Sequence, residues 1–148
     1  MSSWQEFSQS SPDLAAYGYQ RLLGRVAYLA TIRPDGGPRV HPLEAHIALG
    51  CLFVYMDPAS PKAHDLQRDP RYALHAAVED VNGGQGEFAI QGQAVLIIDP
   101  ARRVDLFAAA RVSGSNPQDR YIVFELSISS ALSILYDGDK PVLSRWKV

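Results

Sequence analysis

Residues 55–66, YMDPASPKAHDL, contain the residue types of an anion-binding helix start. Ser60 followed by Pro61 indicates a helix N-terminus, because a serine hydroxyl caps free N–H groups and proline already has the helical φ. Lys62 then places a positive charge in the first turn, where the helix dipole makes it unfavourable by roughly 0.3–1 kcal/mol. Free N–H groups and an ammonium together form an anion site. On this helix alone, a solvated surface lysine and an anion site are equally good interpretations.

The chain before this helix favours the anion site. Residues 57–59, Asp-Pro-Ala, turn the chain sharply from the end of an expected strand into the helix. Strand ends beside helix starts are common positions for bound phosphate. We therefore expect Ser60 and Lys62 to hold a phosphate group.

The segment HPLEAH, residues 41–46, suggests a metal site because it holds two histidines and a glutamate. In a strand, His41 and His46 point to opposite faces, because they are five positions apart, unless Pro42 bulges the strand. Metal ligands must converge, so we expect no metal site here. Two interpretations stay open: one histidine lines a ligand groove, or an edge-strand histidine lies in solvent.

Other reactive residue types fit structural roles. No serine lies in a G-x-S-x-G pattern, and the glycines in residues 82–86, NGGQG, lack the lysine and hydroxyl of a phosphate-binding loop. Cys51 is the single cysteine and lies in an apolar strand pattern, so we expect a buried apolar residue and no internal disulfide. Trp146 is expected in the core, with an aromatic wall for a planar ligand as the alternative.

Composition narrows the classes of protein. Apolar residues make up 47% of the 148 residues and charged residues 20%, which is ordinary for one globular domain spanning residues 1–148. The net charge is −2, with basic and acidic residues interspersed, so neither nucleic acid nor an anionic membrane is an expected partner. The first residues do not read as a secretory signal, and no apolar run has membrane-spanning length, which predicts a cytoplasmic protein.

Hydrophobic periodicity and turn residues predict mostly antiparallel strands with three helices. The helices are expected over residues 12–24, 60–68 and 100–112, and the strands over residues 26–33, 38–49, 51–56, 71–79, 87–99, 121–129, 131–136 and 142–148. Val104, Phe107 and Ala108 are expected to form the apolar stripe of the last helix, and Ile98 to face inward from its strand. Closure into a barrel removes exposed strand edges. We therefore expect a mainly β fold, a small β-barrel with peripheral helices.

Residues 26–75 resemble the N-terminal half of the pyridoxamine 5′-phosphate oxidase-like, FMN-binding split-barrel proteins. Three pieces carry the resemblance, in the same order and spacing: LATIRPDGGPRVHP, the strand ending VYM, and SPKAHDLQRDPRYAL. The resemblance implies a split β-barrel, FMN as cofactor, and transfer of hydride or electrons to or from a small organic substrate. It also implies a homodimer with the flavin sites at the subunit interface.

The resemblance implies roles for particular residues. Ser60 and Lys62 match the family's Ser-Arg-Lys turn, which grips the flavin phosphate, and Pro61 replaces the arginine. Tyr55 and Met56 match a strand-end pair that runs along the isoalloxazine ring, with Met56 where the oxidase has threonine.

Further residues match more distant parts of the family pattern. His41 and His46 fall near two basic residues of the second strand, allowing one deletion. Glu87 falls where the oxidase places a glutamine against the flavin ring. The resemblance also implies that Trp146 and the exposed row of Glu87, Gln91 and Gln93 make contacts across the two-fold axis of the dimer.

The departures from the family pattern shape the expected function. The proline and the two histidines imply a weaker grip on phosphate, and an acidic Glu87 disfavours an anionic reduced ring. The oxidase's substrate-binding arginine and histidine near the C-terminus have no counterpart, so oxidation of pyridoxamine phosphate is not expected. Three alternatives stay open: a reductase using the deazaflavin coenzyme F-420, a non-enzymatic flavin- or haem-binding module with His41 or His46 as iron ligand, and a barrel that has lost its site.

Overall fold

The computed structural model describes residues 1–148 and contains four helices and eight strands. The helices are α1 (Trp4–Ser10), α2 (Pro12–Leu22), α3 (Pro61–Arg68) and α4 (Pro100–Val112). The strands are β1 (Ala27–Ile32), β2 (Pro38–Leu43), β3 (His46–Ala48), β4 (Cys51–Met56), β5 (Arg71–Ala76), β6 (Glu87–Leu96), β7 (Ile122–Asp137) and β8 (Lys140–Lys147). None of the helices is long and apolar enough to cross a membrane.

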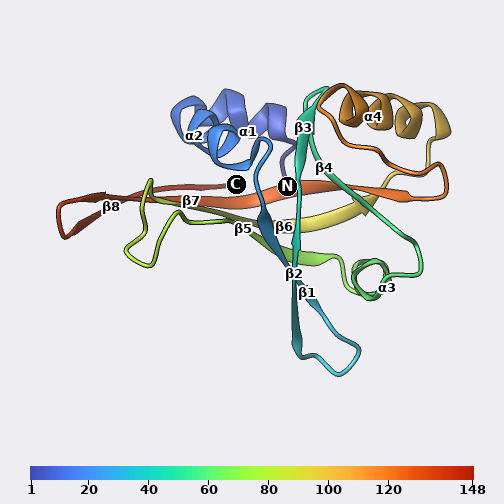
Figure 1. The fold of residues 1–148 in the computed structure, drawn as a ribbon, viewed down its shortest axis with the longest axis horizontal. Helices are drawn as coiled ribbons and strands as arrows, with labels where there is room; N and C mark the ends of the chain where they lie inside the picture. The colour runs from blue at the N-terminus through green and yellow to red at the C-terminus, as the bar shows by residue number, and fades with distance from the viewer.

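All strand pairs are antiparallel, in the order β2-β1-β5-β6-β7-β4-β3, and β8 pairs with β7. The two ends of this order, β2 and β3, are consecutive in the chain and separated only by residues 44–45. A bend in one segment therefore joins the two ends and curls the sheet into a barrel (Figure 1). The predicted split barrel is confirmed.

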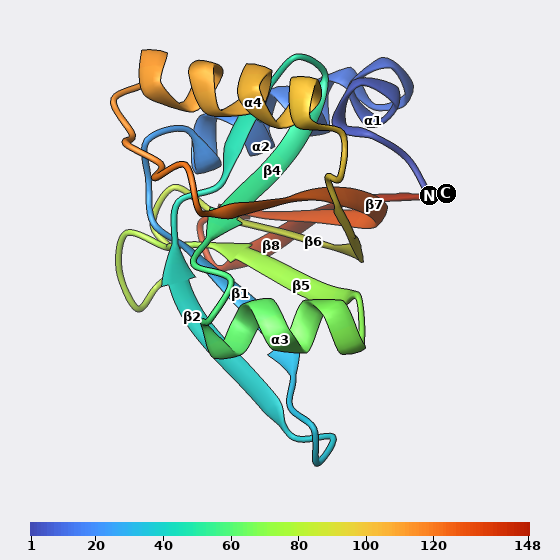
Figure 2. The ribbon, with the colours of Figure 1, turned by 90° about the vertical axis from the view of Figure 1, so that its right-hand side faces the viewer.

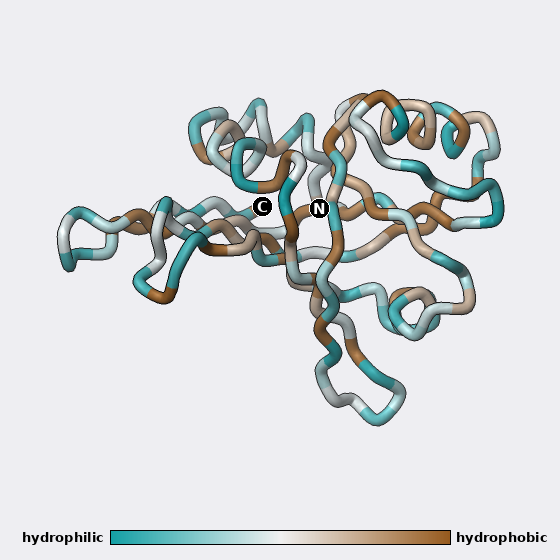
Figure 3. Tube along the Cα trace, viewed as in Figure 1, coloured by the Kyte–Doolittle hydropathy of each residue, from teal (hydrophilic) through white to brown (hydrophobic).

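The helices lie on different sides of the sheet. Helices α1, α2 and α4 lie together along one side, whereas α3 lies on the opposite side, beside β1 and β2 (Figure 2). The two chain ends lie side by side, consistent with the bonds that Ser2 makes to Ile128 and Val148 makes to Ser129. The tips of the β1–β2 and β7–β8 hairpins are hydrophilic (Figure 3). Most apolar segments lie in the body of the barrel, whereas Leu135, Val142 and Leu143 of the β7–β8 hairpin are exposed.

Two apolar clusters hold the barrel and its helices together. The larger has 23 buried residues and includes Phe7, Leu29, Phe88 and Phe124, each at most 1% exposed. The smaller has seven buried residues and lies beneath α4, around Phe107. Burying one such large side chain contributes about 1.5–3 kcal/mol. Cys51 is buried in the smaller cluster, in agreement with its expected apolar role.

Several expected elements differ from the observed ones. The expected strand at residues 38–49 is interrupted between Leu43 and His46, where the chain bends from one end of the sheet to the other. Residues 122–129 and 131–136 belong to one long strand, β7, because β6 pairs with it across the expected break at residue 130. Helix α1 was not expected; its capping box between Ser3 and Glu6 is the local signal for it.

Two expected burial patterns are also wrong. Val104 is 62% exposed and Ala108 is exposed too, whereas Leu106 and Ala110 join Phe107 in the buried stripe of α4. Ile98 is 84% exposed, whereas Ile97 is buried. Strand β6 ends at Leu96, so the alternation of faces does not continue to Ile98.

A buried carboxylate fixes α3 against the first hairpin. Asp65 is 1% exposed, and its Oδ2 accepts hydrogen bonds from Thr31 Oγ1 of β1 at 2.8 Å and from Arg39 Nε of β2 at 2.7 Å. Its Oδ1 accepts a bond from Arg68 Nη2 at 3.0 Å. Desolvation acts to raise the pKa of Asp65, but the bonds from Arg39, Thr31 and Arg68 outweigh it and leave the pKa below its usual range.

Replacing this carboxylate should destabilise the protein in a pH-dependent way. Because the folded-state pKa of Asp65 is lowered, its contribution is present above the ordinary aspartate pKa of about 3.9 and is lost as pH falls through the folded-state pKa. We expect Asp65→Asn to lose about 2–4 kcal/mol of unfolding free energy at pH 7, because two arginines lose their partner. Urea denaturation from pH 7 to pH 3 measures this difference, which should shrink below about pH 4.

The matched control is Asp139→Asn, which changes an exposed carboxylate in the turn between β7 and β8. It should stay within about 0.5 kcal/mol of the parent. Equal stabilities of the Asp65→Asn and Asp139→Asn variants at pH 7 would contradict the assigned role of Asp65.

Candidate functional site

A groove of about 350 Å³ lies at the N-terminus of α3. It brings together five of the residues predicted from the sequence: His46, Tyr55, Met56, Ser60 and Lys62. Leu43, Glu44, Asp57 and Tyr121 complete its lining. The groove therefore joins the end of β4, the start of α3, the β2–β3 bend and the residue before β7.

The N-terminus of α3 provides a backbone donor and a positive charge. Ser60 is the N-cap, and its hydroxyl accepts a hydrogen bond from Ala63 N at 3.4 Å and donates one to Asp57 O at 2.8 Å. Pro61 has no N–H, and the backbone N–H of Lys62 makes no hydrogen bond within the chain. Together with the Lys62 ammonium, this free donor can bind an anion.

His41 supplies a buried nitrogen without a partner in the same electropositive region. Its Nε2 is buried and makes no hydrogen bond. Burial lowers the pKa of His41, and the positive charges of Lys62 and Arg39 lower it further. An anion here would counterbalance these cations. The free Lys62 N–H and the ammonium therefore fit a phosphate group, and the unpaired ring nitrogen of His41 lies within the electrostatic reach of the same ammonium.

A row of aromatic rings lines the groove beside this anion site. The His46 ring lies 5.3 Å from the Tyr55 ring at an interplanar angle of 16°, and the Tyr55 ring lies 6.0 Å from the Tyr121 ring at 20°. His46 also stacks on Phe53 at 5.3 Å. Near-parallel rings of this kind offer an apolar surface to a planar ligand.

His46 is held as a largely buried imidazole. It is 6% exposed, and its Nδ1 lies 3.6 Å from Glu44 Oε1. Burial lowers the pKa of His46, and the nearby Glu44 carboxylate only partly opposes the shift. His46 is therefore neutral at pH 7. His46 lines the groove, and the binding of a ligand there stays a prediction.

Residues far away in the sequence complete the rim. Arg120 pairs with Asp57 and lies over the Tyr121 ring, its guanidinium carbon 5.0 Å from the ring centroid. The hydrogen bond from Arg120 lowers the pKa of Asp57. Sequence reasoning missed Tyr121 and Arg120, because only the pairing of β4 with β7 brings them beside Tyr55. Sequence reasoning considered Glu44 only as a possible metal ligand, together with His41 and His46.

Three predicted residues do not line the groove: His41, which is described above, Glu87 and Trp146. Glu87 accepts a hydrogen bond from Tyr136 OH at 2.8 Å and lies 3.3 Å from His75 Nε2. Trp146 packs on Phe7, with ring centroids 4.9 Å apart, and donates from Nε1 to Ser10 Oγ. Neither Glu87 nor Trp146 contacts the five predicted residues in the groove, so any role for them at the groove requires a second subunit.

Comparisons with known proteins agree on the fold. The chain is similar to a conserved hypothetical protein from Mycobacterium tuberculosis, with a TM-score of 0.68 and 18% identity over 80% of this chain and 81% of that one. It is similar to an F420 reductase, with a TM-score of 0.58 and 22% identity over 77% and 95% of the two chains. A haem-binding protein from Mycobacterium smegmatis gives a TM-score of 0.64 and 18% identity over 89% and 57%.

At these identities the solved structures establish the fold alone. A search of curated proteins finds no match. The family model described as pyridoxamine 5′-phosphate oxidase matches residues 23–133, a stretch that begins at the end of α2, runs into β7 and contains every residue lining the groove. The chain therefore belongs to the pyridoxamine 5′-phosphate oxidase family.

Proposed function

We propose that the protein binds FMN in the groove at the N-terminus of α3 and acts as an oxidoreductase on a small organic substrate. One observation carries the proposal: a free backbone donor and an ammonium at Lys62 open into the same groove as the rings of Tyr55, His46 and Tyr121. This combination matches a ligand that is planar at one end and anionic at the other. Membership of the pyridoxamine 5′-phosphate oxidase family supports FMN as that ligand.

The residues of the groove divide into two roles. Ser60 and Lys62 hold the phosphate at the start of α3, and His41, whose pKa the Lys62 charge lowers, is the candidate for a further hydrogen bond. Tyr55 and Met56, at the end of β4, lie along the isoalloxazine ring. When bound, FMN supplies transfer of hydride or electrons, while the protein supplies orientation and electrostatics.

The charge in the groove differs from the family pattern. Pro61 supplies neither a guanidinium nor an N–H, so Lys62 is the strong cation in this turn. The phosphate grip therefore depends on one ammonium and one backbone donor. We expect FMN binding to be weaker than a Ser-Arg-Lys turn would provide.

A deazaflavin is the second candidate cofactor. An F420 reductase shares the fold, and the Lys62 turn would hold the phosphate of a deazaflavin in the same way. A haem-binding protein shares the fold as well, with His41 or His46 as the candidate iron ligand. His46 is buried and stacked on two rings, which makes it a poor iron ligand and leaves His41 as the candidate. We rank FMN first, because the family match favours a flavin, the deazaflavin second and haem third.

The proposal includes a homodimer in the cytoplasm. Gln91 and Gln93 are exposed on β6, and Glu87 and Trp146 lie outside the groove of their own subunit. A second copy placed across this face would bring Glu87 and Trp146 to the flavin. Isologous contacts of this kind are the commonest form of oligomer.

The visible spectrum of the purified protein distinguishes the candidate cofactors. We expect the two absorption bands of a bound flavin after addition of FMN and gel filtration. If the protein retains the deazaflavin but not FMN, its cofactor is coenzyme F-420. If only haem is retained, with a Soret band in the spectrum, the protein is a haem-binding module. A protein that retains none of the three would contradict the proposal.

Removing the ammonium of the α3 turn should weaken FMN binding. Because a hydrogen bond to a charged group contributes about 1.5–3 kcal/mol, we expect Lys62→Ala to raise the Kd for FMN roughly 10- to 100-fold. Quenching of flavin fluorescence measures the Kd. The control is Lys140→Ala, in the exposed β7–β8 turn region. Equal FMN affinities of Lys62→Ala and Lys140→Ala would contradict the assignment of the phosphate site to the start of α3.

A further inference from the structure

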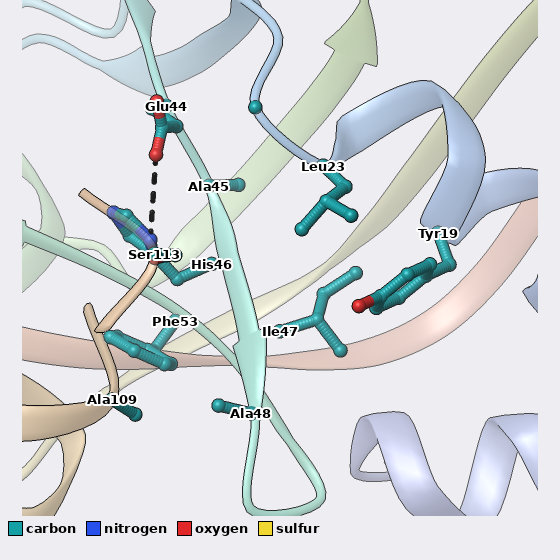
Figure 4. Close-up of a pocket in the computed structure, with 11 residues that line it drawn as sticks. Tyr19, Leu23, Glu44, Ala45, His46, Ile47, Ala48, Phe53, Ala109 and Ser113 are labelled. Carbon is teal, nitrogen blue, oxygen red and sulfur yellow. Dashed lines mark ion pairs between the residues drawn. The ribbon is translucent and has the colours of Figure 1, made fainter. Parts of the chain in front are cut away.

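A second pocket lies on the other side of His46 from the cofactor groove. It has a volume of about 320 Å³ and is formed by the C-terminal end of α2, β3 and the C-terminal half of α4 (Figure 4). Its lining consists of Tyr19, Leu23, Gly24, Glu44, Ala45, His46, Ile47, Ala48, Phe53, Ala109 and Ser113. A volume of this size lies within the range of small-molecule sites, roughly 300–1,000 Å³.

The pocket is apolar apart from one acidic corner. Leu23 and Ile47 lie on one side of β3, and His46 and Phe53 lie on the other (Figure 4). Glu44 stands at the end of the pocket and pairs with His46 (Figure 4). No lysine or arginine lines the pocket, so the Glu44 carboxylate is its one charged group at neutral pH.

Glu44 is held in place while keeping an oxygen free. Its Oε1 accepts a hydrogen bond from Ser115 Oγ at 3.1 Å and lies 3.6 Å from His46 Nδ1. No hydrogen bond within the chain reaches its Oε2. Ser115 belongs to the segment that follows α4, so this loop orients the carboxylate. A carboxylate oriented in this way can accept hydrogen bonds from a ligand and repels anions.

His46 connects this pocket to the cofactor groove. Both His46 and Glu44 line the two spaces, and the imidazole is fixed by stacking on Phe53 and Tyr55. A molecule in the second pocket would therefore contact the same imidazole as a flavin in the groove. No other lining residue belongs to both spaces.

We propose that the pocket between α2, β3 and α4 binds a second small ligand, an aromatic or heteroaromatic molecule that carries a positive charge or a hydrogen-bond donor. The apolar walls recognise the ring, and Glu44 recognises the donor. The coupling of this ligand to a bound flavin through His46 rests on the proposed function, whereas the binding preference rests on the pocket alone. A phosphorylated or carboxylated ligand is disfavoured, because its charge would face Glu44 without a cation nearby.

Two probes of similar size and opposite charge test the preference. Benzamidine is a planar cation with N–H donors, and benzoate is a planar anion. We expect benzamidine to bind at least about tenfold more tightly than benzoate, measured by amide chemical shifts in titrations of the full chain with and without FMN. The shifts should centre on residues 44–48 and 109–113. Equal or tighter binding of benzoate, or shifts elsewhere, would overturn the proposal.

A charge-removing variant tests the role of Glu44. Glu44→Gln should weaken benzamidine binding about tenfold and reduce the preference over benzoate, because the amide keeps the size of the side chain and loses its charge. The matched control, Asp139→Asn, should leave both affinities unchanged. Identical benzamidine affinities of Glu44→Gln and the parent would overturn the assignment of Glu44.

The flavin spectrum separates this proposal from the proposed function. In protein loaded with FMN, benzamidine in the pocket should shift the visible flavin bands, because both ligands contact His46. Binding in the pocket without any shift would overturn the coupling of the two sites through His46. If the protein takes up no FMN, the proposed function fails, while the two titrations still decide the binding preference.

Discussion

Three hydrogen bonds to the buried carboxylate of Asp65 determine where helix α3 lies. Thr31 and Arg39 bond it from the two strands of the first hairpin, and Arg68 bonds it from the helix itself. A buried carboxylate is stable only when charged donors surround it, so these contacts specify one arrangement of helix and hairpin. The free Lys62 N–H lies one turn before Asp65 on the same helix. Its position relative to His41 on β2 therefore depends on this network.

The free donors at the start of α3 and the aromatic row have different physical origins. The site at Lys62 is local: a capping serine, a proline and a lysine create it within three residues. The aromatic row arises from sheet topology, since Tyr55 comes from β4, His46 from β3 and Tyr121 from the segment leading into β7. The groove exists where these two features meet. His46 and Glu44 then connect the groove to a second pocket, which no lysine or arginine lines.

The success of sequence reasoning follows the same division. Ser60 and Pro61 predicted the start of α3 because capping depends on neighbouring residues, and alternation predicted most strands because burial follows the pleat. The sequence did not predict the role of Tyr121 or the second pocket, because both depend on which strands pair. The sequence also did not predict the bend between β2 and β3, because barrel closure rather than local sequence requires this bend. The places of Glu87 and Trp146 relative to a flavin remain predictions that involve a second subunit.

The central claim is that the N-terminus of α3 binds the phosphate of a flavin. The most direct measurement compares the affinities of the protein for FMN and for riboflavin, which has the same ring system without the phosphate. Because the phosphate accepts the Lys62 N–H and pairs with its ammonium, the account predicts that FMN binds roughly 100-fold more tightly. Equal affinities for the two flavins would contradict it.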